Sequence, residues 1–248
     1  MDNSRIRKAA DRVTAGAASA MRLLALDTST EACSAAVWAD GRIFARYEVA
    51  SRDHTSIILP MVDSVLADAG TELEQLDALA FGRGPGSFTG VRIGTGVIQG
   101  IALASGLPVV PVSTLAALAR HAMRTYGIPR VAAVIDARMS EVYWGAYWRD
   151  PDGGLRLIGE ERVCSPATVP ALDGGGWFGA GSGWHAHAQA LREATGLGLG
   201  AWWAGCLPHA EDVAELAALA FRRGGAMVVD SVLPVYLRDN VAAKMPCR

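Results

Sequence analysis

The first residues able to do chemistry are a carboxylate and three hydroxyls that follow an apolar strand. Residues 27–30 read Asp-Thr-Ser-Thr and come directly after the apolar segment 23–26. Ligands of open α/β sheets commonly bind at the carboxyl ends of strands, and a carboxylate with hydroxyls suits a phosphate and its magnesium ion. The same run could instead form a side-chain turn with nearby backbone amides. We therefore expect Asp27, Thr28 and Ser29 either to hold a nucleotide phosphate or to shape this turn.

The second candidate is a glycine-rich segment, 82–92, that runs from the end of a predicted strand into a helix. Glycines let backbone amides converge, and the amino end of a helix favours an anion. The residues that we expect to contact phosphates are Gly84, Gly86, Ser87 and Thr89. The segment lacks the lysine of the G-x-x-x-x-G-K-[ST] pattern, so it is not a P-loop. A tight connection without a ligand explains the same residues.

Four glycines recur in the helix that follows this segment, at positions 90, 94, 96 and 100. Each glycine inside a helix costs about 0.8–1 kcal/mol relative to alanine, so another interaction must offset the loss. Small residues on one stripe let a second backbone approach closely. The approaching element could belong to this chain or to a second polypeptide, and the sequence leaves both open.

The remaining reactive side chains form no recognisable catalytic or metal-binding motif. The five histidines, His54, His121, His185, His187 and His209, include no H-E-x-x-H and no pair at helical i, i+4 spacing. No G-x-S-x-G elbow is present. We therefore expect no catalytic residue and no metal ligand in this chain, and no cofactor that it requires, although ATP or ADP with magnesium could occupy the phosphate-binding residues.

The elements that must position these residues follow the order βββαβα in the first half, over 22–125. Apolar and alternating segments predict strands at 23–26, 33–38, 42–49, 78–81 and 109–112. Helical spacing predicts helices over 57–69, from the glycine-rich segment to about residue 105, and from residue 113. Asp40-Gly41 is typical of a hairpin turn between the second and third strands.

The second half, 126–248, resembles a repeat of the first. Segment 132–136 is an apolar strand that ends in Asp136, as the first strand ends in Asp27, and an alternating strand follows at 141–148. An internal duplication would place Asp136 opposite Asp27, where it could also face a nucleotide. Chance similarity between two short apolar strands is the alternative. Residues 173–207 are rich in glycine and tryptophan and predict no clear element, whereas 211–223 is an amphipathic helix.

Composition limits the partners and the compartment. Lys and Arg number 23 against 25 Asp and Glu, a formal charge of −2, so tight binding of nucleic acid by this chain alone is not expected. Four scattered cysteines and no apolar run of membrane-spanning length predict a cytoplasmic protein without a membrane anchor. Residues 1–21 are expected to be a disordered leader, and Met21 could be the true start.

Several segments together resemble one known family. They are Leu26–Thr30, Gly84–Gly94, Asp136-Ala137-Arg138 with Glu141-Val142-Tyr143, and Pro234–Arg238. Over about residues 22–239 the chain resembles the bacterial TsaB (YeaZ) family. The resemblance implies a two-lobed actin-like and Hsp70-like fold (ASKHA, a ribonuclease H-like duplication), with mixed five-stranded sheets flanked by helices.

The resemblance also implies a role in placing the threonylcarbamoyl group on the tRNA adenosine next to the anticodon. In that family the partners are the paralogue TsaD and the ATPase TsaE, and tRNA is contacted only through the complex. The resemblance implies that TsaD is the catalytic subunit. It carries a His-x-x-x-His metal pair just after the strand that corresponds to 109–112 of this chain. Here those positions hold Ser113 and Ala117, so we expect a non-catalytic subunit.

A pairing surface is implied in the same way. The family resemblance suggests that the helices over 55–69 and 88–105 pair with TsaD, or with a second copy when the chain is alone. The residues that we expect at this interface are Ile57, Ile58, Met61, Val65, Gly90, Val91, Gly94 and Ile98. The alternative to a partner subunit is a stand-alone actin-like ATPase or kinase, or a glycoprotease-like enzyme, in which Asp27 and Asp136 would work with the glycine-rich segment.

Overall fold

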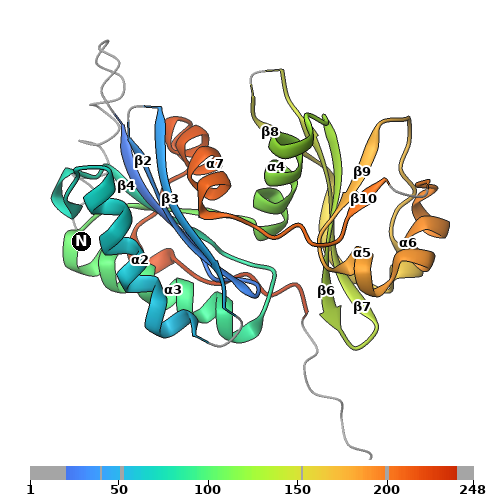
Figure 1. Cartoon of the computed structure of the whole chain (residues 1–248), viewed down its shortest axis with the longest axis horizontal. Coiled ribbons are helices and arrows are strands. Elements are labelled where there is room, and N and C mark those ends of the chain that lie inside the picture. The colour runs from blue at the N-terminus through green and yellow to red at the C-terminus, as the bar shows by residue number, and fades with distance from the viewer. Residues whose placement is uncertain (1–20, 40, 51–52, 152, 199–200, 239–248) are drawn as a thin grey trace, which may run out of the picture.

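The chain folds into two α/β lobes, each built on a five-stranded mixed sheet (Figure 1). The computed structural model describes residues 21–238 except 40, 51–52, 152 and 199–200. The predicted leader, apart from Met21, therefore lies outside the described residues. None of the described helices combines the length and apolar composition that a membrane span requires.

The first sheet has the strand order β3-β2-β1-β4-β5. β1 pairs antiparallel with β2 and β2 with β3, while β4 lies parallel to β1 and β5 parallel to β4. The strands span Arg22–Asp27 (β1), Ala32–Ala39 (β2), Arg42–Val49 (β3), Ala78–Gly82 (β4) and Val109–Val112 (β5). All five strands predicted for the first half are confirmed.

Helices cover both faces of the first sheet because its central strands are apolar on both sides. Side chains alternate along β1, so Leu24 and Leu26 pack against α2 (His54–Asp68) and α3 (Phe88–Ser105), whereas Leu23 packs on the opposite face. α7 (Ala210–Arg222) covers that opposite face. The core of the first lobe therefore lies in two layers, one on each side of β1.

The second sheet repeats the topology of the first, with the order β10-β9-β6-β7-β8. β6, β7 and β8 form an antiparallel meander, and β9 and β10 run parallel to β6 and β9. The strands span Arg130–Arg138 (β6), Glu141–Arg149 (β7), Leu155–Cys164 (β8), Trp177–Ala180 (β9) and Trp202–Trp203 (β10). The shared strand order confirms the predicted duplication.

Short helices replace the long ones in the second lobe. α5 (Gly183–Ala186) and α6 (Ala188–Thr195) lie between β9 and β10, where the first lobe has α3 between β4 and β5. Trp184 and Leu191 of these helices pack on one face of the sheet together with Trp144. Single 3₁₀ turns span Leu73–Gln75, Pro166–Thr168 and Val229–Ser231. Much of the glycine- and tryptophan-rich segment is thus ordered around this second core.

The last helix of each half packs on the other half's sheet. α4 (Thr114–Tyr126) follows β5 but lies on β6 and β7, and α7 follows β10 but lies on β1 and β2. Figure 1 shows α4 and α7 side by side between the two sheets. The lobes therefore do not divide at one point near residue 125, since each contributes a helix to the other.

The end of the described chain returns to the first lobe and runs along α3. Met227 pairs with Val109, and the side-chain amide of Gln99 donates to the carbonyl of Val232 at 2.8 Å. The amide of Val235 then donates to the carbonyl of Arg83 at 2.8 Å. Arg238 reaches the second lobe, where its guanidinium donates to the carbonyl of Ala137 at 3.1 Å. This segment, Val229–Arg238, therefore joins the two lobes, and we call it the C-terminal strap.

Candidate functional site

Asp27 lies at the end of β1, as predicted, but it is fully enclosed. Its Oδ1 accepts hydrogen bonds from the amide of Ser29 at 3.0 Å and from the Ser29 hydroxyl at 2.7 Å. Its Oδ2 is buried next to Gly82 of β4, and neither this oxygen nor the nearby Thr114 hydroxyl has a hydrogen-bond partner among the described residues. Burial raises the pKa of Asp27 to about 6, although the Ser29 hydrogen bonds act in the opposite direction.

The hydroxyl run after β1 packs directly against the glycine-rich segment. The Thr28 hydroxyl donates to the carbonyl of Gly90 at 2.7 Å, and the Ser87 amide donates to the carbonyl of Ser29 at 2.7 Å. A Cβ atom at Gly86 would lie 2.2 Å from the Ser29 carbonyl oxygen. Thr28 and Ser29 are buried. These glycines therefore let the two segments touch, and the polar atoms that we expected to face phosphates bond to each other.

The remaining predicted phosphate contacts lie at the rim of this packed region. The Gly84 carbonyl accepts a hydrogen bond from the amide of Thr114 at 3.0 Å. Ser87 caps α3, with its hydroxyl accepting from the Gly90 amide at 3.4 Å, and Thr89 is exposed in the first turn. Ser87 thus serves as the helix cap, while the nucleotide contacts stay a prediction.

Asp136 occupies the position in the second lobe that Asp27 holds in the first, at the end of the central strand β6. Its carboxylate accepts from the amide of Arg138 at 3.0 Å and pairs with the Arg138 guanidinium at 3.2 Å. His187 approaches it at 3.7 Å. Unlike Asp27, Asp136 is only half-buried and is engaged by basic groups of its own lobe.

The structure corrects the predicted interface. Ile58, Met61, Val65 and Ile98 are buried in the core of the first lobe, between α2, α3 and the sheet. Val91 is buried as well, and Ile57 packs against the same core. The residues that the family resemblance suggested for an interface form the inward-facing stripe of two helices that cover a sheet. These side chains hold the two helices in place on the sheet.

The four glycines of α3 divide into two pairs. A Cβ atom at Gly90 would lie 2.1 Å from the Thr28 carbonyl oxygen, and one at Gly94 would lie 2.7 Å from the Thr28 hydroxyl. At Gly96 and Gly100 a Cβ atom would meet nothing within 4 Å. The first pair therefore serves packing inside the lobe, and the second pair lies on the open face of the helix.

The open face of α3 carries small and apolar residues. Gly96, Gly100 and Leu103 follow one another at helical spacing, and Leu103 is 75% exposed. On the neighbouring helix α2, Leu59 is 51% exposed. Figure 1 shows α2 and α3 together on the side of the first sheet away from α7. We call this surface, formed by Leu59, Gly96, Gly100 and Leu103, the α3 face.

Ser113 and Ala117, which stand where the family catalyst is expected to have its histidines, are both used in packing. The Ser113 hydroxyl caps α4 and donates to the Glu161 carboxylate, which also accepts from the Tyr147 hydroxyl. Burial and the Glu161 charge raise the pKa of Tyr147 well above its usual value. Ala117 is fully buried against α7. Sequence reasoning missed this polar cluster because Glu161 lies on β8, which it did not predict.

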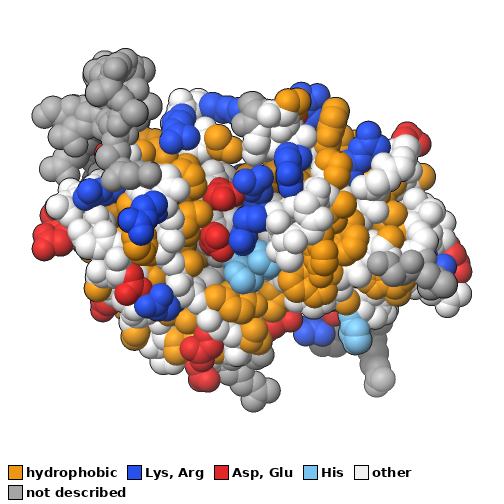
Figure 2. All heavy atoms as spheres, turned by 45° about the horizontal axis from the view of Figure 1, so that its top comes forward, with side chains coloured by type: hydrophobic (Ala, Val, Ile, Leu, Met, Phe, Trp, Pro, Cys, Tyr) orange, Lys and Arg blue, Asp and Glu red, His pale blue; other side chains and the backbone are white. Residues whose placement is uncertain are grey.

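A stack of three rings lies between the lobes. Tyr47 of β3 stacks on His209 with ring centroids 4.0 Å apart, and His209 stacks on His121 of α4 at the same spacing. His121 also contacts the carboxylate of Asp212 at 3.0 Å. Burial and the neighbouring His121 lower the pKa of His209 to about 4. In the space-filling view of Figure 2, histidine side chains lie near the middle of the molecular surface shown, with acidic and basic side chains beside them.

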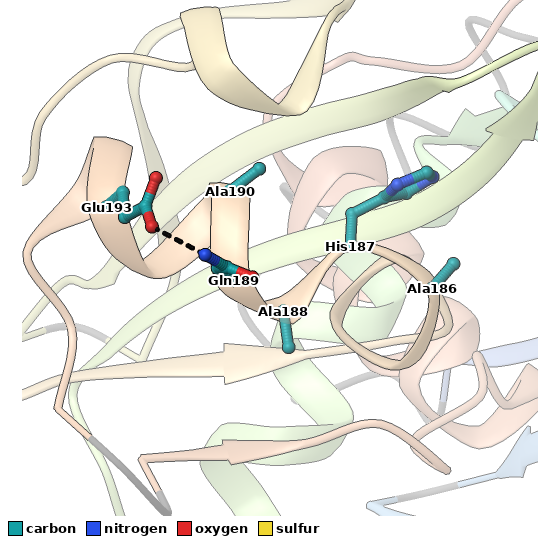
Figure 3. A pocket seen from close by; sticks show the side chains of 6 residues that line it. All are labelled: Ala186, His187, Ala188, Gln189, Ala190 and Glu193. Atoms are coloured by element: carbon teal, nitrogen blue, oxygen red, sulfur yellow. Dashed lines mark hydrogen bonds between the residues drawn. The ribbon is translucent and has the colours of Figure 1, made fainter.

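No group of three or more His, Cys, Asp or Glu side chains among the described residues is placed to hold a metal ion. A shallow hollow beside α5 and α6 is lined by Ala186, His187, Ala188, Gln189, Ala190 and Glu193 (Figure 3). The side-chain amide of Gln189 donates a hydrogen bond to the Glu193 carboxylate at 3.0 Å. Small side chains and one internal hydrogen bond give this hollow few groups for a ligand.

Known proteins resemble this chain over nearly its whole length. The sequence model described as TsaD, tRNA N6-adenosine threonylcarbamoyltransferase, matches residues 46–177. The protein "tRNA threonylcarbamoyladenosine biosynthesis protein TsaB" of Escherichia coli (strain K12) is 48% identical over 227 residues, which covers 90% of this chain and 97% of that protein. The protein of the same name from Haemophilus influenzae is 43% identical and covers 92% of this chain and 98% of its own length.

A solved structure agrees with these sequence relatives. The structure described as YeaZ from Pseudomonas aeruginosa is 50% identical, has a TM-score of 0.81, and covers 88% of this chain and 100% of that chain. The predicted two-lobed actin-like fold is confirmed by the two matched sheets and by this neighbour. The chain belongs to the TsaB (YeaZ) family, within the wider TsaD-type group, and so takes part in tRNA threonylcarbamoyladenosine biosynthesis.

Proposed function

We propose that this chain is a non-catalytic partner subunit required for threonylcarbamoyl transfer to the tRNA adenosine next to the anticodon. It acts by forming a heterodimer with a TsaD-type paralogue, together with a TsaE-type ATPase, and forms a homodimer when alone. tRNA is contacted mainly through the complex, in the cytoplasm. The formal charge of −2 supports this division of labour, since a chain that bound RNA by itself would need a marked excess of basic residues.

The absence of catalysis by this chain alone is supported by what fills the position after β5. A His-x-x-x-His pair there would present two imidazoles from the first turns of a helix. Ser113 and Ala117 offer one hydroxyl, already bonded to Glu161, and one buried methyl group. Neither side chain is a ligand for a transition metal.

The alternative of a stand-alone ATPase or kinase requires room for phosphates between β1 and the glycine-rich segment. Direct hydrogen bonds from Thr28 to Gly90 and from Ser87 to Ser29 close that space. Asp27 is enclosed beside Gly82, where its Oδ2 has no route to a solvated magnesium ion. A nucleotide would have to separate these contacts first, so we propose that this chain requires no cofactor.

The observation that carries the proposal is the open pair of glycines on the α3 face. Gly96 and Gly100 together cost about 2 kcal/mol in helix propensity, and no atom of the described chain uses the space that they leave. A partner helix that packs closely against this stripe would recover that cost. Leu103 of the same helix and Leu59 of the neighbouring helix α2 add exposed apolar surface.

Pairing with the paralogue can be tested by substituting the open glycine. Gly100→Leu should leave the fold intact, because the new side chain points into open space and leucine favours a helix. It should nevertheless block close approach of a partner helix and abolish the complex with the TsaD-type paralogue in size-exclusion chromatography with mass detection.

Gln189→Leu is the matched control, since it adds a leucine to an exposed helix position in the other lobe. It should still form the complex. If Gly100→Leu binds the paralogue as tightly as the unaltered chain, the α3 face is not the pairing surface.

A further inference from the structure

Arg92 on α3 is held between two aromatic rings. Its guanidinium carbon lies 3.2 Å from the centroid of the Phe88 ring and 5.1 Å from that of Tyr236. The two rings approach each other at 6.0 Å between centroids. Phe88 comes from the first turn of the same helix, whereas Tyr236 is brought in by the C-terminal strap. Two segments far apart in the sequence thus build one clamp.

The clamp restrains the arginine but uses none of its hydrogen-bond donors. A guanidinium stacks through its planar face, so its five N–H donors remain in the plane and free to bind. Within the described part of the chain Arg92 forms no ion pair with an acidic side chain, whereas Arg138 and Arg238 pair with Asp136 and Glu141. Arg92 is therefore an oriented cation that no acidic side chain among the described residues neutralises.

The surroundings of the clamp are exposed and apolar. Phe88 is 60% exposed and Tyr236 is 43% exposed. Two large aromatic rings left in solvent beside an arginine match the composition that dominates protein–protein contacts, in which aromatic residues and arginine carry most of the binding energy. A hydrated surface arginine would need neither ring.

The clamp also lies on the same side of α3 as the open glycines. Phe88, Arg92, Gly96 and Gly100 follow each other at intervals of four residues, and all four are exposed. The stripe that begins with the clamp therefore continues into the α3 face. A helix packed along Gly96 and Gly100 would bring its end over Arg92.

We propose that Arg92, fixed by Phe88 and Tyr236, is the charged anchor of the heterodimer and pairs with a carboxylate of the TsaD-type partner. This inference rests on the proposed function and adds the chemistry of the contact: a bidentate bond from the arginine fork to an acidic side chain, flanked by apolar groups that pack on the two rings. It also gives the strap a role, since Tyr236 forms one wall of the clamp.

Three variants test the anchor by equilibrium binding to the purified paralogue. Arg92→Gln should weaken the complex at least about tenfold, because it removes the charge and most of the donors. Arg92→Lys should also bind less tightly, since an ammonium keeps the charge but lacks the planar fork. Tyr236→Ala should weaken binding while leaving the fold unchanged, as the ring is exposed and lies outside the core.

Arg222→Gln on α7 is the matched control, because it removes an exposed arginine from the opposite side of the first sheet and should leave affinity unchanged. If Gly100→Leu abolishes the complex but Arg92→Gln binds normally, the anchor is refuted and the α3 face stands. If both bind normally, the anchor is refuted and the α3 face is not the pairing surface, while a partner-subunit function fails only if the unaltered chain also does not bind the paralogue. Loss of tRNA binding by Arg92→Gln, with an intact protein complex, would assign the clamp to RNA and overturn the inference.

Discussion

At the scale of single residues, Asp27 shows how burial changes what a predicted ligand does. Its place at the end of β1 follows from the sequence, because an acid after an apolar strand is easily recognised. Its enclosure does not follow, since it depends on Gly82 of the neighbouring strand leaving space for the carboxylate and on Ser29 turning back to bond it. Contacts between segments distant in sequence decided the outcome.

The raised pKa of Asp27 predicts a pH-dependent contribution to stability. In the folded chain the carboxyl keeps its proton up to about pH 6, against 3.8 when exposed, so the folded state binds the extra proton between these values. The free energy of unfolding should therefore fall as pH rises through this window, by up to about 3 kcal/mol from this group. Asp27→Asn, which imitates the protonated form, should remove that fall.

The measurement is urea unfolding of both proteins at several pH values from 4 to 7.5. His209 acts with the opposite sign, because its lowered pKa makes stability rise with pH in the same range, so only the difference between the two proteins reports Asp27. The variant should equal the unaltered chain near pH 4 and exceed it at pH 7.5. A variant that is less stable at every pH would show that Asp27 is needed as a charged group.

At the scale of elements, α3 shows what helical periodicity can and cannot predict. Its extent, from the glycine-rich segment to about residue 105, follows from the sequence, and in the structure Ser87 caps its first turn. The pattern does not tell an inward stripe from a docking stripe, since both are apolar. Four glycines look alike in the sequence, and only the position of Thr28 separates Gly90 and Gly94 from Gly96 and Gly100.

Alanine substitutions should therefore change stability in opposite directions along one helix. Gly90→Ala should lower the free energy of unfolding by about 1–3 kcal/mol, because its methyl group would collide with the Thr28 backbone. Gly96→Ala should raise it by up to about 1 kcal/mol, since it gains helix propensity and meets no atom. Chemical unfolding of both variants checks this, and a common sign for the two changes would refute the division of the glycines.

At the scale of the whole molecule, the duplication was predictable and the exchange of helices was not. Two apolar strands that end in Asp27 and Asp136 suffice to suggest two copies of one unit. Nothing in the periodicity of α4 or α7 tells which sheet either helix covers, because both are amphipathic and both sheets are apolar. The exchange is fixed by long-range contacts, such as the ion pair between Arg120 and Glu215 at 2.6 Å, which join α4 to α7.

The exchange of helices adds to the contacts that join the two lobes. α4 and α7 share the ring stack of Tyr47, His209 and His121, and the C-terminal strap crosses between the lobes a second time. The two lobes are therefore joined at more than one place within the described chain.

The central claim is that this chain supports tRNA modification only together with its paralogue, and nucleoside mass spectrometry of tRNA tests it most directly. Unmodified tRNA, an activated threonylcarbamoyl donor and ATP are incubated with this chain alone, with the TsaD-type paralogue and TsaE-type ATPase alone, and with all three. Threonylcarbamoyladenosine should form only in the complete mixture, and Gly100→Leu should abolish it there. Modified nucleoside produced by this chain alone, or by the two partners without it, would contradict the account.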